Sequence, residues 1–329
     1  MSKHLQVLLT GPAAPLAEHV RVSAKIEREE GDLVSRAVIT AALNLHLLAG
    51  VLERVPSGRA YVEDLVRERK KLAFDHGAMR TVALAGMGGL PAGQNAITRV
   101  LEPLGYHCTH TYPMARLNMT GRSYTHRDFP EDLPQFFVSE LHPERFSHAF
   151  QAAVRRVTSS STDPLTPEDK ALLATLGTKG ALKLEDASAL LPRLIDCFSR
   201  RHATPRLTDY ETLLAESAEM AWIATEGNAF NHATDRVPSL EEVVTHQRAL
   251  GRRVKDQIEV SASGRVCQTA FHADPVMRDF LGENGAIHCR EVPGSFFEFI
   301  QRAPFSGEGG LDLAFDTNNA QGIFKMTAA

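Results

Sequence analysis

Two histidines occupy matching positions in two similar segments of the 329-residue chain. Segments 75–80 (DHGAMR) and 231–236 (NHATDR) each begin with an aspartate or asparagine, continue with a histidine and carry an arginine four positions beyond it. Imidazole is the commonest metal ligand among side chains. The recurrence therefore predicts that His76 and His232 are two ligands of one metal at a shared cavity. The alternative is that each is an ordinary half-buried polar residue.

A carboxylate within an aromatic strand is the best candidate for a third ligand. Glu298 lies between phenylalanines in segment 295–302 (SFFEFIQR), and burying its charge there is costly unless a partner such as a metal compensates. Two histidines and one carboxylate form the facial triad of non-haem iron(II) sites. The alternatives for Glu298 are a solvated strand face or pairing with Arg302. Glu140, in the corresponding strand of the first half (136–141), is a candidate fourth ligand or an acceptor for a ligand histidine.

Other polar side chains on these strands are candidates for substrate recognition. Because side chains alternate along a strand, Arg80 shares a face with His76 and is expected at the rim of the metal cavity. Its fork of donors suits a substrate carboxylate. Arg236 is at the equivalent place, although its neighbours favour a local structural role. Gln268 and Thr269 lie inside an apolar strand, and the one that faces inward is expected to hydrogen-bond a bound anion.

The hydrophobic pattern predicts the elements that position these residues. Residues 31–54 carry apolar side chains at three- and four-residue spacing, which indicates an amphipathic helix. Residues 74–141 change to apolar runs broken by Gly and Pro, which predicts the order β-α-β-β-β. The elements expected there are FDHGAMRTVALAG, GQNAITRVLEPLG, YHCTHTYP, ARLNMTGRSYTH and PQFFVSEL.

The same order returns after residues 143–225, whose pattern is almost wholly helical. The later elements are expected to be NAFNHATDRV, SLEEVVTHQRALG, a weakly defined strand near 256–262, RVCQTAFHA, AIHCREVPG and SFFEFIQRA. The repetition predicts a duplicated module.

The predicted fold class is α+β. Two β-α-β-β-β modules are expected to pair about a pseudo-two-fold axis and form a central curved sheet around the metal site. The predicted segments are an N-terminal helical segment (1–73), a first module (74–142), a helical insertion (143–226) and a second module (227–329). We expect these four segments to form one compact unit.

Composition excludes several functional classes. Lysine and arginine number 36 against 40 aspartates and glutamates, a net charge of −4, so the cationic excess that nucleic-acid binding needs is absent. Four cysteines without a CxxC pair indicate neither a zinc ribbon nor a disulfide framework, and favour a reducing cytoplasm. No run of about 18 apolar residues free of charge is present, so we expect no membrane span.

Five ordered motifs resemble those of the 2-oxoadipate dioxygenase/decarboxylase family, also called hydroxyglutarate synthases. They are DHGAMRT (75–81), FVSEL (137–141), NHATDRV (231–237), CQTAF (267–271) and FFEFIQR (296–302). The resemblance implies a fold related to the vicinal oxygen chelate proteins, whose β-α-β-β-β modules agree with the repeat.

The resemblance also implies a site and a reaction. Fe(II) would be held by His76, His232 and Glu298, and Arg80 would recognise a substrate carboxylate. A 2-oxo acid and O2 would give CO2 and a 2-hydroxy acid, as when 2-oxoadipate becomes 2-hydroxyglutarate.

Two other functions are compatible with the same residues. One is a Lewis-acid isomerase or lyase of the glyoxalase type that uses Zn, Ni or Co, with Glu140 as a fourth ligand. The other is a non-catalytic protein that binds a small anion. The sequence does not define the oligomeric state.

Overall fold

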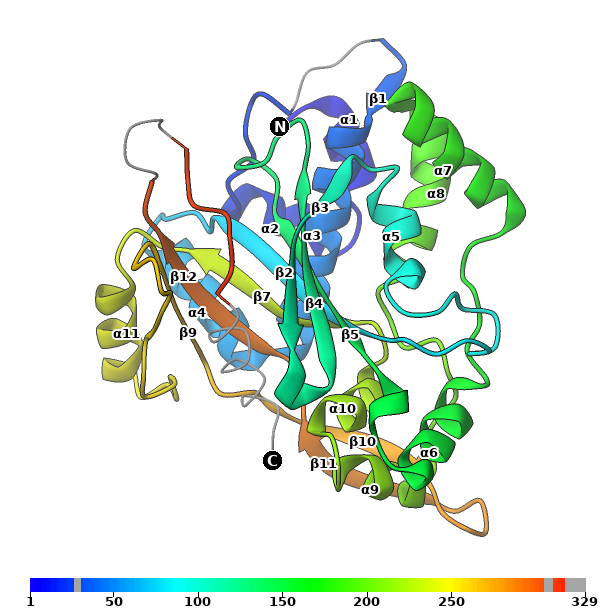
Figure 1. Cartoon of the computed structure of the whole chain (residues 1–329). Coiled ribbons are helices and arrows are strands. Elements are labelled where there is room, and N and C mark those ends of the chain that lie inside the picture. Colours follow the sequence, from blue (N-terminus) through cyan, green and yellow to red (C-terminus); the bar gives the residue numbers. More distant parts are fainter. Residues whose placement is uncertain (27–30, 305–309, 317–329) are drawn as a thin grey trace.

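Eight strands form one strongly curved sheet in the computed structural model, which describes residues 1–26, 31–304 and 310–316 (Figure 1). In spatial order they are β3 (Tyr106–Met114), β4 (Met119–His126), β5 (Gln135–Leu141), β2 (Phe74–Val82), β7 (Phe230–Arg236), β12 (Phe296–Arg302), β9 (Val266–Ala270) and β8 (Glu259–Val260). Two small sheets pair β1 (Leu33–Ser35) with β6 (Ala181–Lys183), and β10 (Pro275–Leu281) with β11 (Ile287–Pro293).

The large sheet consists of two halves with the same internal order. In each half the first strand pairs in parallel with the last strand, β2 with β5 and β7 with β12. The remaining strands of each half follow in antiparallel pairs. Helices α5 (Asn95–Leu101) and α11 (Leu240–Ala249) follow the first strands. This arrangement confirms the predicted α+β class with two β-α-β-β-β modules, while the four segment boundaries stay a prediction.

Strands β2 and β7 meet antiparallel at the centre of the sheet. His76 is opposite Thr234, and Ala78 is opposite His232. The pseudo-two-fold axis therefore passes close to Gly77, with one histidine on either side of it. Because side chains alternate along a strand, both histidines lie on the same face of the sheet.

Helices from two parts of the chain cover the sheet. The N-terminal part contributes α1 (Lys3–Leu8), α2 (Ala13–Leu16), α3 (Arg36–Arg54) and α4 (Pro56–Arg67), and the insertion contributes α6 (His148–Thr158), α7 (Pro167–Lys179), α8 (Leu184–Asp196), α9 (Leu207–Leu214) and α10 (Ala218–Glu226). Short 3₁₀ turns span Ala17–His19, Ala115–Leu117 and Pro143–Arg145. Helices α1–α4, α7 and α8 share one core with Phe136 and Phe230, whereas α6, α9 and α10 share a second core with Phe137.

Helix α3 begins later than the sequence predicts. The pattern indicates a helix from residue 31, but the helix starts at Arg36, where the Ser35 hydroxyl accepts a hydrogen bond from the backbone N–H of Val38. Residues Leu33–Ser35 are extended because they pair with Ala181–Lys183. Leu33 and Val34 fit the helical spacing by chance. The strand with which they pair lies about 150 residues further along the chain, so the local sequence gives no sign of it.

By length and composition, α3 is the one helix in the described ranges that could cross a membrane. However, 78% of the 18-residue apolar stretch of this helix is buried inside the protein. Burial of this kind is typical of a core helix.

One predicted strand of the second module lies outside the large sheet. The segment AIHCREVPG forms β11, but β11 pairs only with β10, whose strand was not predicted. Strand β12 instead pairs directly with β9. Most side chains of the β10–β11 hairpin are at least partly exposed, so its pattern lacks the alternation that marks a half-buried strand.

Candidate metal centre

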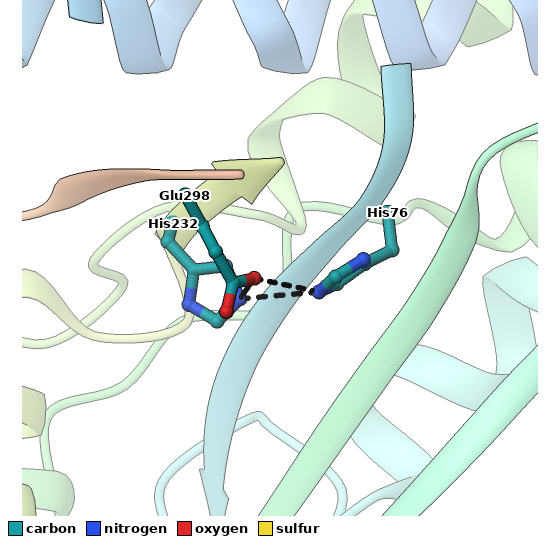
Figure 2. Close-up of side chains that lie close together, drawn as sticks. All are labelled: His76, His232 and Glu298. Carbon is teal, nitrogen blue, oxygen red and sulfur yellow. Dashed lines mark hydrogen bonds and ion pairs between the residues drawn. The ribbon is translucent and has the colours of Figure 1, made fainter. Parts of the chain in front are cut away.

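Three side chains from central strands converge on one buried point. His76 comes from β2, His232 from β7 and Glu298 from β12, and Figure 2 shows them pointing toward one another. Glu298 Oε2 lies 3.1 Å from His76 Nε2 and 3.3 Å from His232 Nε2, and the two Nε2 atoms are 3.4 Å apart. All three residues are buried, and their ligand atoms lie within 4.8 Å of one another. The structure therefore brings together the three residues selected from the sequence.

The residue before each histidine orients its ring. Asp75 Oδ1 lies 2.9 Å from His76 Nδ1, and Asn231 Oδ1 lies 2.9 Å from His232 Nδ1. A carboxylate or an amide oxygen only accepts hydrogen bonds, so each histidine donates through Nδ1–H. Nε2 is then the ring atom that each histidine turns toward Glu298. The Asx-His pair that recurs in the sequence thus has the same structural role in both modules.

A buried arginine holds the Asp75 carboxylate in place. Arg302 donates from Nε and Nη2 to Asp75 over distances of 2.9 to 3.2 Å. Burial raises the pKa of Asp75, but Arg302 and His76 outweigh this effect and hold the pKa well below its usual range. Asp75 is therefore ionised. Burial lowers the pKa of His76, but hydrogen bonds to Asp75 and Glu298 prevail and raise it.

The donor atoms require positive charge at their centre. Two imidazole nitrogens and the Glu298 carboxylate face one point, and Glu298 Oε1 is buried without a hydrogen-bond partner in the described structure. Burial raises the pKa of Glu298, but His232 and His76 outweigh it and lower the pKa to about 2. The Thr234 hydroxyl donates to Oε2 at 2.6 Å, which leaves Oε1 open. Two nitrogens and one carboxylate are the donor set of the facial triad, so a divalent cation fits these residues.

A small cavity adjoins the three candidate ligands. Its volume is about 30 Å³, room for only one or two water molecules. The lining residues are His76, Ala78, Met79, Arg80, Phe137, Ser139, Asn231, His232, Gln268 and Phe315. Arg80 and Gln268, both predicted from the sequence to serve substrate binding, thus border the same cavity as the two histidines.

Arg80 is fully buried and remains charged. Its guanidinium carbon lies 5.0 Å from the centre of the Trp222 ring, a cation–π distance. Burial lowers the pKa of Arg80 to about 10, while Glu219 opposes the shift. The side chain is therefore cationic at neutral pH, and a carboxylate entering the cavity would meet a positive charge.

Three residues considered from the sequence do not reach this cavity. Glu140 accepts hydrogen bonds from the backbone N–H of Gln94 and from Arg122 instead. Arg236 donates to the backbone carbonyl at position 131, in accord with a local structural role. The Thr269 hydroxyl donates to the backbone carbonyl at position 257, so Gln268 is the member of its pair that faces inward.

Three residues near the site are not among those predicted from the sequence. Thr234 lies 3.2 Å from His76 Nε2 and donates to Glu298, and strand alternation from His232 is a signal that could have found it. Trp222 and Phe315 come from a helix and from an irregular segment far along the chain. No local pattern connects them with the strands.

Comparisons with known proteins identify the family of the chain. Residues 44–325 match the sequence profile described as 2-oxoadipate dioxygenase/decarboxylase. A curated relative, the chloroplastic 2-oxoadipate dioxygenase/decarboxylase of Arabidopsis thaliana, is 24% identical over 312 residues, which cover 84% of this chain and 74% of the relative.

Solved structures share the fold. A putative glyoxalase superfamily protein from Ralstonia eutropha JMP134 is 52% identical, with a TM-score of 0.91 and coverage of 96% of this chain and 99% of that chain. The hydroxyglutarate synthase of Oryza sativa in complex with 2-oxoadipate is 18% identical, with a TM-score of 0.69 and coverage of 94% and 95%.

Proposed function

Because the chain belongs to the 2-oxoadipate dioxygenase/decarboxylase family, we propose that it is an Fe(II)-dependent enzyme that oxidatively decarboxylates a 2-oxo acid. Family membership makes the chain an oxidoreductase of the dioxygenase class. The proposed reaction converts R–CH2–CO–COOH and O2 into R–CHOH–COOH and CO2, so both oxygen atoms end in the products. The observation that carries the proposal is the convergence of His76, His232 and Glu298 beside the buried Arg80.

The three converging side chains would hold the metal. Iron(II), when bound by a facial triad, supplies open coordination positions for substrate and O2 together with the redox capacity that the reaction needs. Two imidazole nitrogens and a carboxylate are suitable ligands for iron(II). Oε1 of Glu298, which is buried without a hydrogen-bond partner among the described residues, also supports this assignment. Glu140 lies elsewhere, which counts against the four-ligand Lewis-acid alternative.

The protein's own side chains would position the acid and limit access of water. Arg80 offers a buried cation with several donors to a carboxylate, and it is the one lysine or arginine among the described residues that line the cavity. Gln268 borders the cavity, and its amide would hydrogen-bond a substrate oxygen. The rings of Phe137 and Phe315, 5.2 Å apart, form an apolar wall.

We propose a 2-oxo acid of the 2-oxoadipate type as the substrate. Two relatives carry 2-oxoadipate in their names, and a hydroxyglutarate synthase has been solved with it. A second carboxylate on such an acid would have Arg80 as its partner while the 2-oxo acid group lies at the three ligands. We also propose a reducing, cytoplasmic setting, with which the four free cysteines accord.

Oxygen consumption by the Fe(II)-reconstituted protein tests the proposed function. We expect 2-oxo acids to cause O2 uptake and CO2 release in equal amounts, with a 2-hydroxy acid as the other product. The panel should contain 2-oxoglutarate, 2-oxoadipate, 2-oxopimelate and branched monocarboxylic 2-oxo acids. Absence of O2 uptake with every acid contradicts the proposal, and product formation without O2 favours Lewis-acid chemistry instead.

A further inference from the structure

The ring of Phe315 lines the cavity beside the candidate ligands. It lies edge-on to His76, with ring centres 4.8 Å apart, and 5.2 Å from the ring of Phe137. The remaining volume of about 30 Å³ is far below the roughly 300–1,000 Å³ of ordinary small-molecule pockets. A 2-oxo acid with several carbons therefore fits only if one wall of the cavity gives way.

Phe315 belongs to a segment that is tied to both halves of the sheet. The backbone N–H of Phe315 donates to the hydroxyl of Tyr112 on β3, at 3.0 Å. Arg302 on β12 donates to the carbonyls of Asp312 and Ala314, at 2.8 and 3.0 Å, and its guanidinium lies 5.0 Å from the Phe315 ring. These contacts hold the segment so that the Phe315 ring lies at the cavity.

The two phenylalanines of the wall differ in how firmly they are held. Phe137 is on β5, a strand with ladder partners on both sides, so its backbone cannot move without breaking the sheet. Phe315 is half-buried and lies outside the helices and strands. The Phe315 ring is therefore the part of the wall that can shift, and how far it shifts limits the length of the acid that enters.

We propose that Phe315 is a specificity-determining residue that sets the length of the 2-oxo acid admitted to the site. This inference rests on the proposed function, because it assumes that the cavity receives such an acid. An apolar wall distinguishes substrates that differ by one methylene by about 10- to 200-fold. Removing the ring should therefore extend the accepted length by one or more carbons.

The test compares Phe315→Ala and the more conservative Phe315→Leu with the wild type. The acids are 2-oxoglutarate, 2-oxoadipate and 2-oxopimelate, which differ by one methylene each. We expect the ratio of kcat/KM for the seven-carbon acid to that for the five-carbon acid to rise about tenfold or more in Phe315→Ala, with Phe315→Leu intermediate. Leu311→Ala is the matched control, because Leu311 is on the same segment but does not line the cavity, and its ratio should not change.

A binding measurement separates this inference from the proposed function. The chain has one tryptophan, Trp222, which stacks on Arg80, so its fluorescence reports anaerobic binding of each acid to the metal-loaded protein. A wild type that turns over 2-oxo acids, with a length profile unchanged by Phe315→Ala, overturns the inference and leaves the function intact. If no acid is turned over, the proposed function is wrong, and the Trp222 titrations alone test the role of Phe315. Lower Kd values for longer acids in Phe315→Ala then support that role. Unchanged Kd values overturn it.

Discussion

Asp75 Oδ1 accepts a hydrogen bond of 2.9 Å from His76 Nδ1. The same contact in the second module is made by a neutral amide, Asn231, so the two modules orient their histidines alike but with different charge. Only the aspartate has a buried partner, Arg302. The duplicated fold thus gives an electrostatically asymmetric site, with the more basic imidazole at His76.

Replacing Asp75 by asparagine should weaken metal binding without abolishing it. Asparagine retains an oxygen that accepts from His76, but it lacks the charge that increases the basicity of the ring. We expect the Kd for Zn(II) or Fe(II) to rise about 10- to 100-fold, measured by competition with a chromophoric chelator. Arg302 also loses its anionic partner, so the free energy of unfolding measured in urea should fall by roughly 3 kcal/mol.

Asp209→Asn provides the control for this variant. Asp209 is buried in an ion pair with Arg156 within the helical insertion, so its replacement also breaks a pair but far from the ligands. We expect lower stability with unchanged metal affinity. Equal metal affinity in Asp75→Asn and the wild type would refute the orienting role of Asp75.

Replacing Arg80 by methionine should impair substrate binding and spare the metal. Methionine fills much of the same space against Trp222 but offers no charge or donor. Because a hydrogen bond to a charged group contributes roughly 1.5–3 kcal/mol, we expect KM for the 2-oxo acid to rise about 10- to 100-fold at unchanged iron content. Arg80→Lys should have an intermediate KM, because lysine retains the charge but cannot donate two parallel hydrogen bonds to a carboxylate. An unchanged KM in Arg80→Met would exclude Arg80 from substrate recognition.

Asp235 should make stability depend on pH. Burial raises the pKa of Asp235 to about 6, against hydrogen bonds from Tyr61 and the backbone N–H of Ala73 that lower it. Because the folded state holds this proton more tightly than the unfolded state, the associated stability is full below about pH 4 and is lost as the pH rises through 6. The wild type should therefore become less stable relative to Asp235→Asn by about 2 kcal/mol between pH 4.5 and 8.

Urea unfolding of both proteins at these two pH values measures this difference. Asparagine retains an acceptor for Ala73 and carries no charge at either pH. A free-energy difference between the two proteins that is the same at pH 4.5 and 8 would contradict the raised pKa.

The fold was largely predictable because its pattern occurs twice. The repeated Asx-His-x-x-x-Arg segments identified β2 and β7, which are the strands that meet at the centre of the sheet. The β10–β11 hairpin was not recognised as a separate sheet because most of its side chains are at least partly exposed. The start of α3 was misplaced because Leu33–Ser35 pairs with a strand that follows much later in the chain.

The site was predictable where the strands themselves carry it. Alternation along β2 placed Arg80 beside His76, and an aromatic neighbourhood marked Glu298. Phe315 could not be found in this way, because its position depends on hydrogen bonds from Arg302 and to Tyr112. Such contacts depend on the tertiary structure and leave no periodic signal in the sequence.

Iron stoichiometry tests the central claim most directly, namely that three side chains from three central strands hold one metal. The wild type, reconstituted anaerobically with Fe(II) and desalted, should retain one iron per chain. His76→Ala, His232→Ala and Glu298→Ala should each retain close to none. His202→Ala, which removes a buried histidine that hydrogen-bonds the backbone carbonyl of Ala224, should retain one. Full iron content in any of the three ligand variants, with the fold intact by circular dichroism, would contradict the assignment.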